Sequence, residues 1–250
     1  MFDIEEIKKK IYQIAAITDR GQRLNKLIAP MYQEKLKEME ELIDSLENFN
    51  TEVSEEKLSG EWELIYSSVE LFRSSPFFLA IEKALSDELK SNLFFKLHQL
   101  QVESFGLSTI GRISQNIDFD KKEFLSSFDT TIFGLTTIPI IGWFKLLPTF
   151  GGRVITLADD LVLEDKALKM NLQKTKVSKV DGLNKIPLFS KLLMERWYPV
   201  NEVWKKLPWN KESPSCEILV IFLDDEIRVM KDIYGSTFVY IRPTISSLKY

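Results

Sequence analysis

The chain has 250 residues but only one cysteine and one histidine. A single cysteine excludes a disulfide framework, and Cys216 lacks neighbours at metal-ligand spacing, so we expect a small buried hydrophobic residue there. The sequence around His98, which lies in a strand-like pattern, supplies neither a nucleophile nor an orienting acid for a triad. No glycine-rich phosphate loop is present. We therefore predict a protein that is not an enzyme and that holds no metal or cofactor.

Long hydrophobic runs and a strong charge of one sign are also missing. The net charge is −4 and the isoelectric point is near 5.4, which argues against a nucleic-acid partner because phosphate binding needs a basic surface. No run of about 18 uncharged apolar residues occurs, as a membrane-spanning helix needs. The nearest approach, residues 130–144, is shorter and is broken by Pro139 and two glycines. No secretory signal or transit peptide is visible.

The N-terminal region has the hydrophobic period of helices. Isoleucines among residues 4–14 recur at steps of three or four, and residues 36–46 repeat the pattern. The sequence Thr-Asp-Arg-Gly at residues 18–21 interrupts it, and Gly21 can adopt the left-handed conformation that ends a helix. We predict two amphipathic helices in a segment of residues 1–52, followed by a polar linker.

After Gly60 the hydrophobic period changes from about 3.6 residues to 2, which indicates strands. Polar turns such as residues 118–122 and 224–226 lie between them, and the adjacent acids at 159–160 and 224–225 are expected to serve turns instead of catalysis. Consecutive antiparallel strands favour an up-and-down barrel, because closure removes exposed edges. About nine strands are predicted, around residues 60–67, 93–102, 113–119, 124–132, 154–158, 168–172, 218–223, 227–230 and 237–241.

Two insertions interrupt the strand rhythm of the predicted barrel, which spans residues 58–245. Residues 70–91 have a helical pattern, and residues 181–211 contain Trp197, Trp204 and Trp209 among basic residues, more aromatic surface than a plain loop needs. The chain also has 17 phenylalanines, seven tyrosines and five tryptophans. This aromatic content can either fill a barrel core or line a cavity for an apolar ligand.

The sequence Gly60-Glu61-Trp62 at the first strand predicts one closed end of the barrel. Glycine lets the backbone turn there, and the tryptophan plugs the end. A cationic side chain from a late strand, Arg228 or Arg242, is expected to lie over the indole as a cation–π partner. We interpret this arrangement first as a structural bolt and second as a ligand contact.

The apolar run of residues 132–150 contains two prolines and two glycines, so a regular central strand or helix throughout is not expected. One interpretation is a hairpin buried on the barrel. The other is a loop that touches a membrane or covers the barrel mouth, since Trp143, Phe144 and Lys145 combine aromatic and basic character suited to a lipid interface.

Taken in order, these segments resemble the plastid lipid-associated proteins, also called fibrillins or plastoglobulins. The most specific matches are the first-strand sequence LSGEWELIYSS at residues 58–68 and the ending FLDDEIRVMKDIYGSTFVYIRP at residues 222–243. The turn TDRG and the helix sequence EELIDSLENFN at residues 40–50 also match. The resemblance covers nearly the whole chain, although its middle matches only in strand rhythm.

The resemblance implies a mainly β fold: a lipocalin-like antiparallel β-barrel of about eight to nine strands with two N-terminal α-helices. It implies a non-enzymatic protein that binds a lipophilic isoprenoid, a prenylquinone or a carotenoid, at thylakoids or plastid lipid droplets. A cyanobacterial member, thylakoid-associated or soluble, or a mature plastid form fits the lack of a visible transit peptide.

The expected site residues, drawn from the residue patterns and the resemblance together, fall into three groups. The predicted ligand-binding residues are Trp62, Leu64, Tyr66, Phe124, Phe128, Arg228, Phe238 and Tyr240. The predicted membrane-contact residues are Ile140, Trp143 and Phe144. The structural signature residues are Gly60, Asp232 and Gly235.

Two other functions remain open at this point. In the first, the barrel is filled and the protein is a scaffold, whose N-terminal helices or Trp197–Trp209 surface dock an enzyme of prenylquinone synthesis; aromatic and arginine side chains suit such an interface. In the second, the barrel is a carrier or lyase for a bilin. The predicted partners are a lipophilic small molecule, a membrane surface contacted peripherally, and a protein.

Overall fold

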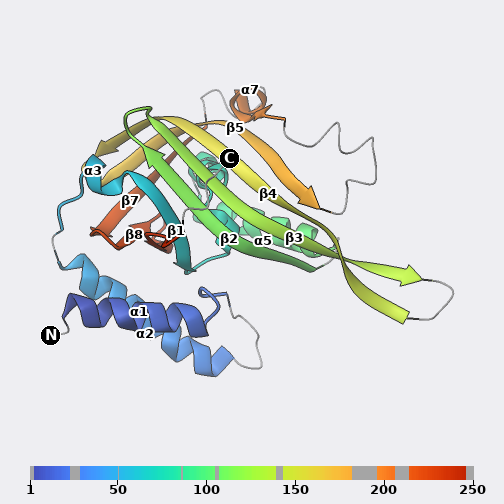
Figure 1. Cartoon of the computed structure of the whole chain (residues 1–250), viewed down its shortest axis with the longest axis horizontal. Helices are drawn as coiled ribbons and strands as arrows, with labels where there is room; N and C mark the ends of the chain where they lie inside the picture. The colour runs from blue at the N-terminus through green and yellow to red at the C-terminus, as the bar shows by residue number, and fades with distance from the viewer. Residues whose placement is uncertain are drawn as a thin grey trace.

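The computed structural model describes residues 3–22, 29–49, 51–85, 87–104, 107–138, 143–181, 196–205 and 214–245, and its structural features are given for these residues. A ring of antiparallel strands forms the body of the molecule, and the N-terminal helices lie against one side of it (Figure 1). The prediction of a mainly β fold with about nine antiparallel strands and two N-terminal helices is confirmed.

The two N-terminal helices are α1 (Ile4–Ile17) and α2 (Ala29–Glu47). The interruption predicted at residues 18–21 is present: α1 ends at Ile17 with Thr18 as its C-cap. Gly21 is left-handed, with φ of +86°, but Asp19, with φ of +51°, is the left-handed residue that directly follows the cap. Lys8 fixes α1 to the sheet: its Nζ lies 2.6 Å from a carboxylate oxygen of Asp224 and 3.2 Å from one of Glu226. Burial alone lowers the pKa of Lys8, but the hydrogen bonds to these acids and to Glu5 raise it overall.

Eight strands close into the ring, and a ninth short strand extends it at one edge. The hydrogen-bonded order is β4-β3-β2-β1-β9-β8-β7-β5-β6, and the additional pairing of β4 with β5 joins the two ends. Every strand pair is antiparallel. The strands are β1 (Gly60–Ser67), β2 (Leu107–Asp118), β3 (Glu123–Ile138), β4 (Trp143–Glu164), β5 (Ala167–Asp181), β6 (Tyr198–Pro199), β7 (Ser215–Leu223), β8 (Ile227–Lys231) and β9 (Thr237–Ile241).

One predicted strand is a helix. Residues 93–102 lie in α5 (Glu88–Ser104), so the strand prediction for this segment, and with it the strand position of His98, is wrong. Alternation at Leu93, Phe95 and Leu97 resembles a strand, but Leu93, Leu97 and Leu100 also have helical spacing. The surrounding Lys, Gln, Glu and Leu residues favour helices, and here they decide the outcome.

Hydrophobic side chains form two clusters on opposite faces of the ring. The interior cluster takes side chains from every strand of the closed ring, for example Leu64 on β1, Phe124 on β3 and Phe238 on β9. The outer cluster joins α1 and α2 to the outer faces of β1, β7, β8 and β9, with Ile11 and Val239 among its members. Each Å² of apolar surface removed from water contributes about 25 cal/mol to stability, so both clusters stabilise the fold.

Short helical segments cover the two ends of the ring. Helix α3 (Glu55–Leu58) precedes β1, and its Leu58 packs into the interior cluster at the end where β1 begins. At the other end β1 continues into the 3₁₀ helix η1 (Leu71–Ser74) and helix α4 (Pro76–Leu85). Leu79 and Ala80 of α4 also belong to the interior cluster. The predicted helical character of residues 70–91 is therefore confirmed for α4, which caps the interior.

The apolar run of residues 132–150 is a hairpin in its backbone. Strands β3 and β4 pair continuously from Phe124↔Ala158 to Ile138↔Trp143, with one irregularity near Pro148. The neighbouring strand β2 begins opposite Phe133, so beyond this point β3 has no β2 partner. Figure 1 shows the two strands extending past the ring as a two-stranded ribbon. We call residues 134–138 and 143–147 the ribbon.

Part of the second insertion, residues 181–211, lies among the described residues. Strand β6 pairs with β5, and helix α7 (Val200–Lys205) follows it. Trp204 is buried, and the half-buried Trp197 lies under Lys174 and Lys176, with each Nζ about 5 Å from the ring centroid. Trp209 falls outside the described residues.

Candidate functional site

Trp62 lies at the centre of a buried cationic arrangement inside the ring. Its indole nitrogen donates a hydrogen bond to the Leu58 carbonyl, 2.8 Å away, which ties β1 to α3. The guanidinium carbons of Arg242 and Arg228 lie 3.8 Å and 4.9 Å from the centroid of the Trp62 ring. The prediction that a late arginine lies over this indole is confirmed for both residues.

The two arginines differ in their surroundings. The guanidinium of Arg242 donates its hydrogen bonds to backbone: Nη1 donates to the carbonyls of Ser59 and Glu61, and Nη2 donates to that of Lys57. A Cβ added at Gly60, whose φ is +101°, would lie 2.8 Å from Nη1 of Arg242. Arg242 therefore acts as the structural bolt between the start of β1 and the end of β9, and glycine at residue 60 leaves the space for it.

Arg228 lies wholly inside the ring, with an exposed fraction of 0%. Its Nη2 donates to Oε1 of Gln115, 2.5 Å away, and its guanidinium lies 4.3 Å from the centroid of the Tyr240 ring. The amide of Gln115 in turn donates to the Tyr240 hydroxyl at 2.8 Å and to the Ser74 carbonyl at 3.3 Å. We call Trp62, Gln115, Arg228 and Tyr240 the interior polar site.

The guanidinium of Arg228 is incompletely satisfied. Its Nε and Nη1 are buried and have no hydrogen-bond partner. Among the residues that the structure describes, no carboxylate forms an ion pair with it. Burial, with a smaller contribution from Arg242, lowers its pKa to about 9, so it still bears its charge at neutral pH. A buried cation with free donors is costly, and such groups normally have a partner.

Most of the predicted ligand-binding residues come together around this site. Leu64, Phe124 and Phe238 are in the interior cluster with Trp62 and Tyr240, and Phe128 packs at its margin. Tyr66 does not join them. The register of β1 against β9 shifts between Leu64 and Tyr66, which turns Tyr66 toward the outer cluster beneath α1 and α2.

Gln115 was missed by the sequence reasoning, although a signal was available. Ile113 and Ile117 flank it at intervals of two residues, so all three side chains share the interior face of β2. A polar side chain on an apolar strand face is an informative exception, because buried polar groups are usually hydrogen-bonded.

The predicted signature residues near the C-terminus form the turn between β8 and β9. Oδ1 of Asp232 accepts hydrogen bonds from the backbone nitrogens of Tyr234 and Ser236, at 3.0 Å and 2.7 Å. Gly235 has a φ of +87°, a conformation that favours glycine. Both residues therefore shape the turn.

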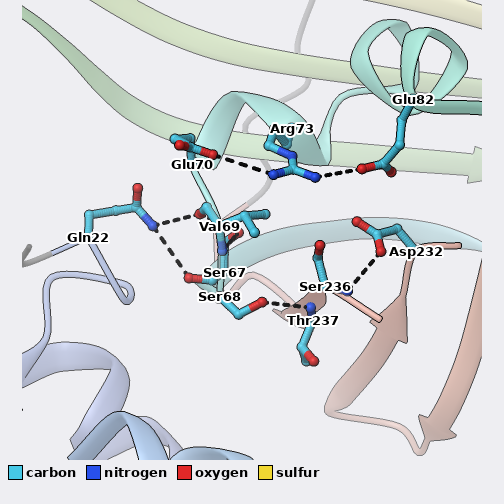
Figure 2. A network of polar contacts seen from close by, with 10 residues as sticks. All are labelled: Gln22, Ser67, Ser68, Val69, Glu70, Arg73, Glu82, Asp232, Ser236 and Thr237. Atoms are coloured by element: carbon cyan, nitrogen blue, oxygen red, sulfur yellow. Dashed lines mark hydrogen bonds and ion pairs between the residues drawn. The ribbon is translucent and has the colours of Figure 1, made fainter. Parts of the chain in front are cut away.

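A second polar network joins this turn to α4 and η1, and Figure 2 shows it. Arg73 lies between Glu70 and Glu82, with its Nη2 2.5 Å from Oε1 of Glu82 and its Nη1 3.7 Å from Oε2 of Glu70. Burial, and then the negative charge of Asp232, raise the pKa of Glu82 to about 7, while Arg73 opposes that rise. We call Glu70, Arg73, Glu82 and Asp232 the rim network, since it holds α4 over the end of the ring that this helix covers.

Two of the predicted membrane-contact residues, Trp143 and Phe144, lie at the far end of the ribbon. Trp143 pairs with Ile138 and Phe144 pairs with Thr137 in the backbone register. Ile140 falls outside the described residues.

The described residues present little reactive chemistry. Cys216 is wholly buried on β7, as expected, and burial raises the pKa of its thiol to about 12. Within the described ranges, no group of three or more histidine, cysteine or acidic side chains could hold a metal ion. The same ranges contain no helix that is both long and apolar enough to cross a membrane.

Comparison with known protein families gives a match over residues 5–241 to the family model described as PAP_fibrillin. The chain belongs to the PAP_fibrillin family. This match confirms the resemblance to plastid lipid-associated proteins, and it spans the helices, the ring and both specific motifs. Neither the curated proteins nor the solved structures gave a significant match.

Proposed function

We propose that this PAP_fibrillin protein binds a lipophilic isoprenoid, a prenylquinone or a carotenoid, inside its ring of strands and performs no catalysis. The single observation that supports this most directly is the buried Arg228, which has free hydrogen-bond donors inside an otherwise apolar interior. Aromatic and aliphatic side chains with a few convergent polar groups are typical of small-molecule sites.

We propose that the lipophile reaches the interior past α4. Gln115 of the interior polar site donates to the Ser74 carbonyl at the end of η1, so the cap and the site are in direct contact. A lipophile that enters from this end displaces α4, which the rim network holds in place. Lids of this kind commonly control entry and release of ligands.

The test is organic extraction and mass spectrometry of the protein purified from its native cell. A stoichiometric quinone or carotenoid is expected, and Trp62→Ala is expected to lose it. Leu219→Ala, at an exposed position on β7, is the matched control and should retain the ligand. Extracts free of any lipophile from the wild-type protein would contradict the proposal.

We propose in addition that the ribbon contacts the surface of a membrane or lipid droplet, at thylakoids or plastid lipid bodies. Its sequence is apolar, and it carries Trp143 and Phe144 next to Lys145, a combination suited to the interface. The extension of the ribbon past the ring supports this role.

Flotation with vesicles of neutral plastid-type galactolipid tests this contact. The wild-type protein is expected to float with the vesicles, and the double variant Trp143→Ser with Phe144→Ser is expected to remain below. Equal flotation of both proteins, with unchanged thermal unfolding, would contradict the membrane role of the ribbon.

The scaffold and bilin alternatives receive less support. Trp204 is buried and Trp197 lies under two lysines, so these two tryptophans do not form an exposed aromatic docking surface. The N-terminal helices, the other docking site of the scaffold alternative, use their apolar residues to pack on the ring. No observation on the described residues favours a bilin. Lipophile binding is therefore the function that we put forward.

A further inference from the structure

The structure points to a specific chemical class of ligand: we infer that the ligand carries a carbonyl or carboxylate oxygen that accepts hydrogen bonds from Arg228. This inference rests on the proposed function, because it concerns the headgroup of the lipophile bound inside the ring.

The first step is the inventory of donors on Arg228. A guanidinium has five N–H groups, and in Arg228 one nitrogen, Nη2, donates to Gln115. Nε and Nη1 are buried inside the ring without hydrogen-bond partners. These two nitrogens therefore lack an acceptor, and a ligand from outside the chain would supply it.

The second step is the charge. Arg228 keeps a positive charge at neutral pH and has no ion-pair partner among the described residues, whereas the buried Arg73 has two acids beside it. The aromatic faces of Trp62 and Tyr240 stabilise that charge but accept no conventional hydrogen bond. An oxygen with full or partial negative charge satisfies both requirements, and a pure hydrocarbon satisfies neither.

The third step is the position of Arg228 relative to the rest of the interior. In the register of β8 with β9, Arg228 lies opposite Tyr240, and Phe238 is the next interior residue of β9 toward the α4 end. Trp62 and the Leu58 carbonyl lie at the α3 end, and Gln115 joins the site to Ser74 beside α4. A headgroup at Arg228 therefore places an apolar tail toward α4. This orientation matches a molecule with one oxygenated end and one hydrocarbon end.

Two pairs of matched ligands test the inference on purified protein, by displacement of Nile red. Decylbenzoquinone is compared with decylbenzene, and hexadecanoate with hexadecane. In at least one pair the oxygenated member is expected to bind about tenfold to a hundredfold tighter than its hydrocarbon, as a charged hydrogen bond predicts. The pair that shows this preference identifies the acceptor group as a quinone carbonyl or a carboxylate.

Arg228→Met, which removes the donors but keeps an apolar side chain, is expected to abolish that preference. Arg112→Met on the same sheet is the matched control and should retain it, since Arg112 is partly exposed and pairs with Glu63. If Arg228→Met does not fold, the comparison of ligands on the wild-type protein still decides.

The outcomes separate the two proposals. Hydrocarbons that bind as tightly as their oxygenated partners, or a preference that survives in folded Arg228→Met, would overturn the headgroup inference and leave the proposed function standing. Failure of all four ligands to displace the probe, together with a lipophile-free native extract, would overturn both.

Discussion

Arg73 and Glu82 form a buried ion pair between η1 and α4, and the carboxyl group of Asp232 on the opposite turn acts on the same acid. Figure 2 shows the hydrogen bond from the backbone nitrogen of Ser236 to Asp232. With one arginine beside two buried acids, ionising both acids costs free energy, because burial and the second negative charge each disfavour the charged form. The protonation of Glu82 is thus linked to the stability of the cap.

The first prediction concerns pH. Glu82 has a pKa of about 7 in the folded protein, above the value of about 4.3 expected in an unfolded chain. The folded state therefore binds more protons between these values, and the stability contributed by protonated Glu82 is lost as the pH rises toward and through 7. Urea unfolding at pH 5 and pH 8 should show this loss, and Glu82→Gln should reduce it. The exposed Glu88→Gln is the control; an unchanged pH dependence in Glu82→Gln would refute the assignment.

The second prediction compares two glycines with nearly equal backbone angles. Gly21 and Gly235 have φ of +86° and +87°, so alanine is strained at both. At Gly235 nothing lies within 4 Å of an added Cβ, whereas at Gly21 it would collide with the backbone oxygen of Ser67. Gly235→Ala should lower the free energy of unfolding by about 1 kcal/mol, and Gly21→Ala by clearly more. Equal losses in urea unfolding would show that the contact with Ser67 is unimportant.

The third prediction concerns Cys216. Its thiol is wholly buried and burial raises its pKa to about 12, so little thiolate forms at ordinary pH. Ellman's reagent at pH 8 should label the native protein only as fast as it unfolds, and should label it at once in urea. Rapid labelling of the native protein would mean that β7 opens locally.

The fourth prediction concerns the bolt. Arg242→Met removes donors from the carbonyls of Ser59, Glu61 and Lys57 and a cation from the Trp62 ring, so the free energy of unfolding should fall by about 1–3 kcal/mol. Arg242→Lys should recover part of the loss, since it restores the charge but not the planar set of donors. Unfolding at the same urea concentration in all three proteins would argue against the bolt.

The ring was predictable because polar turns such as residues 118–122 and 224–226 separate short apolar segments of strand length. The rule of alternation failed at Tyr66, because the irregularity after Leu64 turns this side chain to the outer cluster; the mark of it in the sequence is Ile65, which interrupts the alternation. It failed again at α5, where short apolar segments satisfy both periods. The error at Tyr66 thus arises because pairing between strands that are distant in sequence overrides the local pattern.

The candidate site was predictable in its parts but not in its connections. One cationic residue, Arg228 or Arg242, was expected over Trp62, and both lie there. Their different hydrogen bonds depend on the register between β1, β2, β8 and β9. Sequence spacing does not encode that register directly. The role of Gln115 as the partner of Arg228 follows only when β2 is placed beside β1.

The pairing of β1 with β9 also determines when the protein can finish folding. Strand β1 lies between β2 and β9, so one of its edges remains open until synthesis has reached residue 241. Pairing of strands so distant in sequence is slow, and an open edge invites association with other chains. Trp62 on β1 and Tyr240 on β9 meet only in this last step, so an emerging chain cannot retain a ligand before the ring closes.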